Sequence, residues 1–112
     1  MAKMLTFTQG DYGMSINIQI LNDKKELIHI LEEDKVFAHI QYPSGECKDV
    51  DEDNLFVIDR LKGIVRFVIK EEYTEEEGFY QVFVGIEAPE YKINANKAIQ
   101  YFVNAKHGIG QH

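Results

Sequence analysis

Apolar residues at every second position dominate the stretch from residue 63 to residue 86, and this spacing is the strongest constraint on the fold. Val65, Phe67 and Ile69 alternate with other residues in its first half, and the same alternation runs from Tyr80 to Ile86 in its second. Side chains two positions apart share one face of a β-strand, whereas a helix places apolar residues three and four positions apart. An acidic run with five glutamates, residues 71–77, separates the halves. The stretch therefore predicts a strand, a tight acidic corner and a second strand.

Alternation of the same kind recurs along the rest of the chain. It is most regular in residues 14–21, where four side chains are expected to face the core: Met14, Ile16, Ile18 and Ile20. Residues 36–42 repeat it with Val36, Ala38, Ile40 and Tyr42. Further strands are expected at residues 3–8, 46–50, 55–58 and 98–104, with Gly, Pro and Asp in the turns between them.

Two segments carry no single pattern. In residues 26–34, Leu27, Ile30 and Leu31 fit one turn of a helix, whereas Leu27, His29 and Leu31 fit one face of a strand. We interpret this segment as a loop with a short strand. Residues 91–96 are interpreted as a loop or a weak strand.

Seven or eight short strands with turn residues between them are typical of a two-sheet β-sandwich. We expect an all-β, immunoglobulin-like antiparallel β-sandwich in one domain at residues 1–104, with a disordered tail at residues 105–112. The Tyr80 hydroxyl, just after the acidic corner, can reach back across it as in the tyrosine corner of immunoglobulin-like domains. The alternative is that Tyr80 only starts a strand.

Composition excludes several classes of function. The 112 residues carry a net charge of −7, which opposes binding to nucleic acid and to anionic membranes. We therefore expect neither a nucleic-acid partner nor membrane insertion. Cys47 is the only cysteine, so no internal disulfide is possible. The first residues lack the apolar run of a signal peptide, and we expect synthesis in the cytoplasm.

The metal-ligating residue types do not form a recognisable site. The four histidines, His29, His39, His107 and His112, have no zinc-ligand spacing to one another or to Cys47. Asp49, Asp51 and Asp53 have the spacing that begins a calcium loop, but the later glycine and glutamate of such a loop are missing. We predict no metal site and no cofactor.

Nucleophiles are equally unsupported. Cys47 has no histidine at a readable motif distance, and Ser15 and Ser44 lack the glycines of a nucleophile elbow. We predict that the chain has no catalytic residues and is not an enzyme.

Three apolar residues lie on the faces opposite those assigned to the core. They are Phe37, Val68 and Phe83. Clustered apolar side chains on a surface mark an interface with another protein, so we expect one on an outer sheet face.

Several turns and strands together resemble the N-terminal domain of phage baseplate upper proteins. Residues 7–13, which contain the Thr-Gln-Gly-Asp turn, match the opening of that domain. The other matching segments are Asn22-Asp23, residues 38–45 with their Pro-Ser-Gly turn, Gly63-Ile64-Val65, Gly78-Phe79-Tyr80 and residues 99–103. The resemblance covers almost the whole chain.

The resemblance implies an immunoglobulin-like sandwich that is a structural part of a phage or prophage tail baseplate. Such a domain attaches to the distal tail protein at the tail hub and helps carry receptor-binding proteins in the virion tail, as a homo-oligomer in the particle. It brings no catalytic residues. The alternative is a carbohydrate-binding sandwich that acts in host attachment, with Tyr12, Tyr42 and Tyr91 as its aromatic platform.

Overall fold

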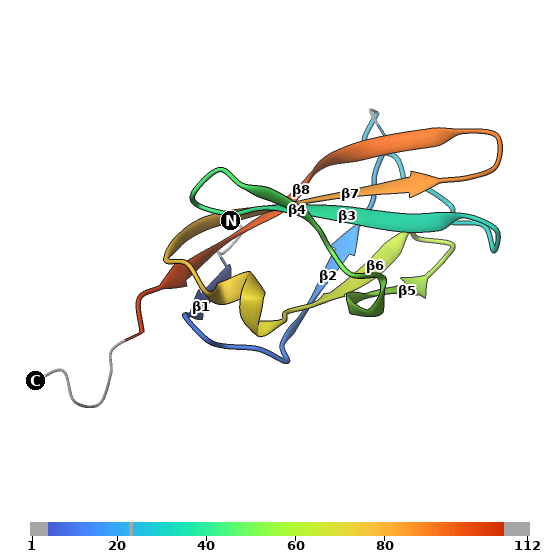
Figure 1. The fold of residues 1–112 in the computed structure, drawn as a ribbon. Helices are drawn as coiled ribbons and strands as arrows, with labels where there is room; N and C mark the ends of the chain where they lie inside the picture. The colour runs from blue at the N-terminus through green and yellow to red at the C-terminus, as the bar shows by residue number, and fades with distance from the viewer. Residues whose placement is uncertain (1–4, 23, 107–112) are drawn as a thin grey trace, which may run out of the picture.

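Two β-sheets packed face to face form the protein in the computed structural model, which describes residues 5–22 and 24–106, with the side chains of 94–98 left aside. Figure 1 shows the two layers. The elements are β1 (Leu5–Thr8), β2 (Ser15–Gln19), β3 (Lys35–Gln41), β4 (Cys47–Asp49), η1 (Glu52–Asn54), β5 (Leu55–Asp59), β6 (Ile64–Val68), η2 (Glu71–Thr74), β7 (Gly78–Glu87) and β8 (Lys92–Asn104). One sheet has the order β1-β8-β7-β3-β4 and the other the order β2-β6-β5. The all-β two-sheet sandwich with eight strands is confirmed. Its immunoglobulin-like character stays a prediction, and most of the tail, 107–112, lies outside the described residues.

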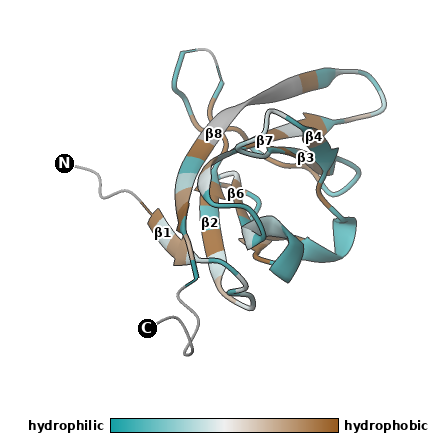
Figure 2. Ribbon diagram, turned by 60° about the vertical axis from the view of Figure 1, so that its left-hand side comes forward, coloured by the Kyte–Doolittle hydropathy of each residue, from teal (hydrophilic) through white to brown (hydrophobic). Residues whose placement is uncertain are grey.

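The faces assigned to the core are the faces that are buried. Ile16, Ile18 and Ile20 of the β2 region, Ala38 and Ile40 of β3 and every second residue of β6 and β7 are buried between the sheets, whereas Met14 and Val36 are partly buried against the same core. Figure 2 shows the resulting brown bands alternating with paler or teal ones along the strands. Period-two alternation therefore located the core correctly.

One strand pair runs in an unexpected direction. β1 lies parallel to β8, with Leu5 beside Tyr101 and Thr8 beside Asn104, whereas the other strand pairs are antiparallel. The expectation of an antiparallel sandwich is corrected for this edge. Alternation predicts the face on which a side chain lies but not the direction of the strand. The ring of Phe7 packs edge-on against that of Tyr101, 5.4 Å between centroids, which anchors β1 to the core.

Residues 26–34 form a loop, as interpreted from the sequence, with a single bridge in place of the short strand. Neither the helical turn nor the strand face with Leu27, His29 and Leu31 inward is formed. Leu27, His29 and Leu31 are exposed, whereas Ile28 and Ile30 are buried. The only bridge within the segment joins Leu27 to Leu21. The chain instead lies across the open end of the sandwich, where the Ile30 amide donates to the Arg60 carbonyl at 2.8 Å. Both alternating sets are apolar, so the sequence did not distinguish the inner set from the outer one.

Gly63 makes this close approach possible. It has a φ of +65°, and a Cβ at this position would lie 2.4 Å from the carbonyl oxygen of Ile28. Any side chain here would push the β5–β6 turn away from residues 26–34, called the crossing segment below.

The interpretation of residues 91–96 as a loop or a weak strand understates their strand structure. They belong mostly to β8, which has 13 residues and pairs with β7 through two register shifts. The shifts let the long β7–β8 hairpin continue although its apolar alternation breaks. The acidic loop of residues 51–54 contains η1, and the acidic corner contains η2.

Candidate docking surfaces

The residues with catalytic or metal-binding chemistry do not come together. His39 Nδ1 lies 2.7 Å from Asp49 Oδ1 on the outer face of the larger sheet, and Cys47 is exposed on the edge strand β4. Asp51 pairs with Lys70, which also contacts Glu72 at 3.1 Å. The hydrogen bonds that Lys70 Nζ donates to the carboxylates of Asp51 and Glu72 raise the pKa of Lys70.

Potential ligands form no metal site in the part of the chain that the structure describes, where no three His, Cys, Asp or Glu side chains are grouped for one. His29 is exposed in the crossing segment. His107 and His112 lie outside the described residues. The described ranges also contain no helix of the length and apolarity that crossing a bilayer requires.

Three buried tyrosines, Tyr42, Tyr80 and Tyr101, hold the acidic corner that connects β6 to β7. The Tyr80 hydroxyl accepts a hydrogen bond from the Glu76 amide at 2.9 Å and donates to the Glu76 carbonyl at 3.1 Å. Tyr42 donates to the Glu72 carbonyl at 3.0 Å, and Tyr101 donates to the Tyr73 carbonyl at 2.7 Å. The expectation that Tyr80 reaches back across the corner is confirmed.

The tyrosine rings pack on one another beneath the corner. Tyr80 and Tyr101 are stacked with centroids 4.9 Å apart, and Tyr42 lies 5.2 Å from Tyr80. Burial, together with the nearby carboxylates of Glu76 and Glu75, raises the pKa of Tyr80 to about 12. Burial likewise raises the pKa of Tyr42, Tyr73 and Tyr101. All four phenols are therefore neutral over the physiological range.

The turn after β1 supports the same corner from the other side. Thr74 Oγ1 donates to the Asp11 carbonyl at 2.7 Å, and Gln9 Nε2 donates to the Glu75 carbonyl at 2.9 Å. Asp11 in turn accepts the Thr8 amide at 2.9 Å, and Gly10 has a φ of +89°. The corner is thus tied to β7, to β8, to the residue that follows β3 and to the turn after β1, although it carries no strand pairing itself.

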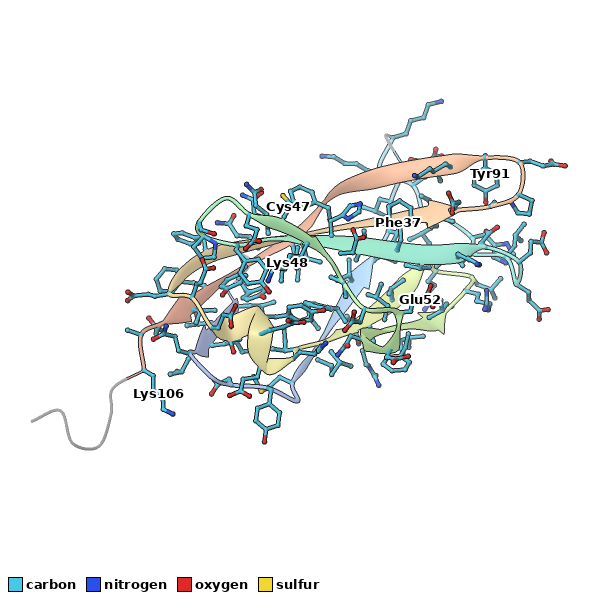
Figure 3. All side chains as sticks on the ribbon, in the orientation of Figure 1. Phe37, Cys47, Lys48, Glu52, Tyr91 and Lys106 are labelled. Carbon is cyan, nitrogen blue, oxygen red and sulfur yellow. The ribbon has the colours of Figure 1, made fainter. Side chains whose placement is uncertain are left out.

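The corner presents its carboxylates outward in a fixed arrangement. Glu71, Glu75 and Glu77 are exposed. Glu71, Glu72 and Glu75 line a hollow of about 500 Å³, at whose rim Lys106 lies (Figure 3). The surface is suited to contact with a basic face of another protein.

Aromatic side chains lie on the outer face of the larger sheet. Phe37 and Phe83 lie on the neighbouring strands β3 and β7, and both are half-buried. Farther along, Phe79 and Phe102 pack edge-on with centroids 4.8 Å apart, and Phe79 is half exposed. Val68 is on the other sheet, so the expected grouping of Phe37, Val68 and Phe83 is wrong for Val68. The Phe79–Phe102 pair was missed because it requires the β7–β8 register.

The edge of the larger sheet is open along the first half of β3. β4 pairs only with residues 39–41 of β3, and one further bond joins the Val50 amide to the Ala38 carbonyl. Val36 points its amide and carbonyl to the same side as Ala38, because backbone groups alternate in a strand. In the described residues no strand pairs with this side of residues 35–37.

A groove runs along this open edge. A hollow of about 460 Å³ lies between Lys35–Phe37 and the chain at Asp51–Glu52, and one of about 240 Å³ continues from Val36 to Val57 of β5. β5 is itself the outermost strand of its sheet. Figure 3 labels Phe37 and Glu52 beside this groove. Its walls thus combine apolar side chains with unpaired backbone of a strand edge.

The aromatic platform of a carbohydrate-binding module is not formed as expected. Tyr42 is 2% exposed and belongs to the core. Tyr12 and Tyr91 are exposed, but Tyr12 lies in the β1–β2 turn and Tyr91 at the tip of the β7–β8 hairpin, at opposite ends of the molecule (Figure 1). The three tyrosines therefore do not share a surface.

No family model matches the chain, and no curated protein matches it in sequence. Solved structures do match it in fold. One is the N-terminal domain of phage TP901-1 ORF48, which is 11% identical, with a TM-score of 0.58 over 94% of this chain and 86% of that chain. The resemblance to the N-terminal domain of phage baseplate upper proteins is thereby confirmed at the level of the fold.

Proposed function

We propose that this chain is a structural component of a phage or prophage tail baseplate. It docks to the distal tail protein at the tail hub, helps carry the receptor-binding proteins and catalyses no reaction. It is made in the cytoplasm of the host bacterium and is present in several copies in the virion tail, and its β-sandwich is of the immunoglobulin-like type.

The observation that carries this proposal is the fold shared with a phage protein domain over 94% of the chain. The surfaces support an assembly role as well. The chain combines an open strand edge, an outward aromatic face and a rigid acidic corner, and such features serve binding to proteins.

The open edge of β3 is the best candidate for the docking contact. A strand of the partner that pairs with Val36 would complete the sheet and cover the groove next to β5. Main-chain hydrogen bonds would supply affinity, and the apolar groove would select the partner's side chains.

The proposal is tested by co-purification with the distal tail protein of the same phage. Val36→Pro removes the amide at the open edge without removing a bond to β7, since Val36 points away from β7. We expect this variant to weaken the complex about tenfold or more, measured by calorimetry.

Val36→Ala is the matched control, because it shortens the same side chain but keeps the amide. We expect it to retain binding within about threefold. No recovery of any tail protein with the unmodified chain would contradict the proposed function. Equal binding by the proline and alanine variants, with both folded by circular dichroism, would contradict only the strand-edge contact.

A further inference from the structure

A cavity lies at the end of the molecule formed by the tip of the β7–β8 hairpin. Its volume is about 370 Å³, and its walls come from the turn before β3 and from the hairpin tip. The wall residues that matter here are Leu31, Glu33, Asp34, Pro89, Glu90 and Tyr91. Tyr91 is labelled at the tip in Figure 3. None of these residues belongs to the groove along β3.

Asp34 is a buried carboxylate that is only half satisfied. The residue lines the cavity although it is only 7% exposed. Oδ2 accepts the Leu31 amide at 2.8 Å and the Tyr91 hydroxyl at 3.1 Å. Oδ1 is buried and has no hydrogen-bond partner among the described residues. A buried acceptor without a partner costs free energy, so the site favours an incoming donor.

The charges around the cavity favour a cationic donor. Glu33 and Glu90 are exposed at its rim. Burial, the hydrogen bond to Asp34 and the charges of Asp34 and Glu33 raise the pKa of Tyr91. The nearby Arg60 guanidinium donates to the Leu31 carbonyl at 2.6 Å and forms no ion pair with Asp34 in the described part of the chain. The Asp34 carboxylate is therefore not neutralised by an ion pair within the described residues.

We propose that this cavity receives the guanidinium group of an arginine on a neighbouring protein of the particle. The proposal rests on the proposed function for the existence of such a neighbour. The flat guanidinium stacks on the ring of Tyr91 and directs its N–H groups at Asp34 Oδ1, while the arginine stem lies on Leu31 and Pro89. Because Oδ1 is buried, other side chains of the cavity wall shift as the arginine enters, while Tyr91 keeps its hydrogen bond to Asp34 Oδ2 and offers its ring for stacking.

The probe for this proposal is N-acetyl-arginine amide, titrated into the isotope-labelled protein and followed by amide and tyrosine-ring NMR signals. N-acetyl-citrulline amide has nearly the same shape without the charge and serves as the matched ligand. We expect saturable shifts for arginine in residues 31–34 and 88–91 up to about 50 mM, and none for citrulline. No saturable shift with arginine, or equal shifts with both ligands, would overturn the proposal.

Two variants locate the binding. Asp34→Asn keeps an acceptor for the Leu31 amide and removes the charge, so we expect arginine affinity to fall about tenfold. Glu90→Gln removes a rim charge from an exposed side chain, and we expect about a twofold loss. Undiminished binding in Asp34→Asn would contradict the site, and if that variant fails to fold, undiminished binding in Glu90→Gln does so.

The arginine titration and the test of the proposed function can fail independently of each other. Arginine binding uses no tail protein, whereas docking at the β3 edge is measured with the distal tail protein. Loss of arginine binding with intact co-purification would reject the cavity alone.

Discussion

Tyr80 makes two hydrogen bonds with one backbone residue, donating to the Glu76 carbonyl and accepting from the Glu76 amide. Replacement by Phe keeps the ring stacked on Tyr101 but leaves both groups of Glu76 without their partner. We expect Tyr80→Phe to lower the free energy of unfolding by about 1–3 kcal/mol, measured by urea denaturation.

Tyr12→Phe is the control for that experiment. Tyr12 is 69% exposed, so its change is expected to stay within about 0.5 kcal/mol. An equal loss in both variants would show that the Tyr80 hydroxyl contributes nothing specific to the corner.

At this scale the sequence predicted contacts that are local and missed those that are distant. Tyr80 and Glu76 are four positions apart, so the reach of the hydroxyl follows from the corner itself. Tyr42 and Glu72 are 30 positions apart, and Asp34 and Tyr91 are 57 apart. Such pairs depend on how the two sheets pack, which alternation does not encode.

The acidic corner predicts how stability depends on pH. Its phenols are neutral in the folded state, and the pKa of Tyr80 is raised to about 12 from an ordinary value near 10. A raised pKa gives stability that is complete below pH 10 and is lost as the pH rises through 12. We expect urea unfolding free energies to be flat from about pH 7 to 9 and to fall steeply above pH 10, by on the order of 2 kcal/mol for Tyr80 alone.

Tyr80→Phe should make this alkaline decline shallower, because one of the raised phenols is gone. The same decline in the variant, with the same slope, would assign the effect to the other tyrosines or to the lysines.

Elements with regular alternation were predicted with their correct faces, and the errors have separate physical causes. β1 is parallel to β8 because its direction depends on the path of the chain through the β1–β2 turn. β8 was predicted too short because its register shifts interrupt the period of two that marks a strand. The crossing segment, residues 26–34, has isoleucines on one alternating face and leucines on the other, so both faces are apolar and alternation does not distinguish the inner set.

The two sheets supply a single cluster of buried side chains, which includes Ile18 and Val65 from one sheet and Ile40 and Val82 from the other. Each sheet buries its apolar face only against the other sheet, so neither sheet has a core of its own. We expect the protein to unfold in one cooperative step, with coincident transitions by far-ultraviolet circular dichroism and by methyl NMR signals.

Val65→Ala tests whether the sheets are coupled. Val65 is fully buried in β6, so its truncation should lower the midpoint of both signals equally. Two separated transitions would mean that the sheets are independent units.

At the scale of the whole molecule, the sequence predicted the layered architecture, and the chain shares this fold with the N-terminal domain of a phage protein. The candidate surfaces came only with the structure, since the open half of β3 follows from the shortness of β4. The cavity at Asp34 likewise needs the hairpin tip to meet a loop that is distant in the chain.

The gathering of tyrosines under one corner has a spectroscopic consequence. The chain contains no tryptophan and six tyrosines, and four of these are gathered at residues 71–77: Tyr73 in the corner and Tyr42, Tyr80 and Tyr101 beneath it. Intrinsic fluorescence therefore comes from tyrosines alone, four of them at a single locality, and energy transfer among like rings at these separations lowers the anisotropy of the emission. A partner that disturbs the corner can be followed without any attached dye.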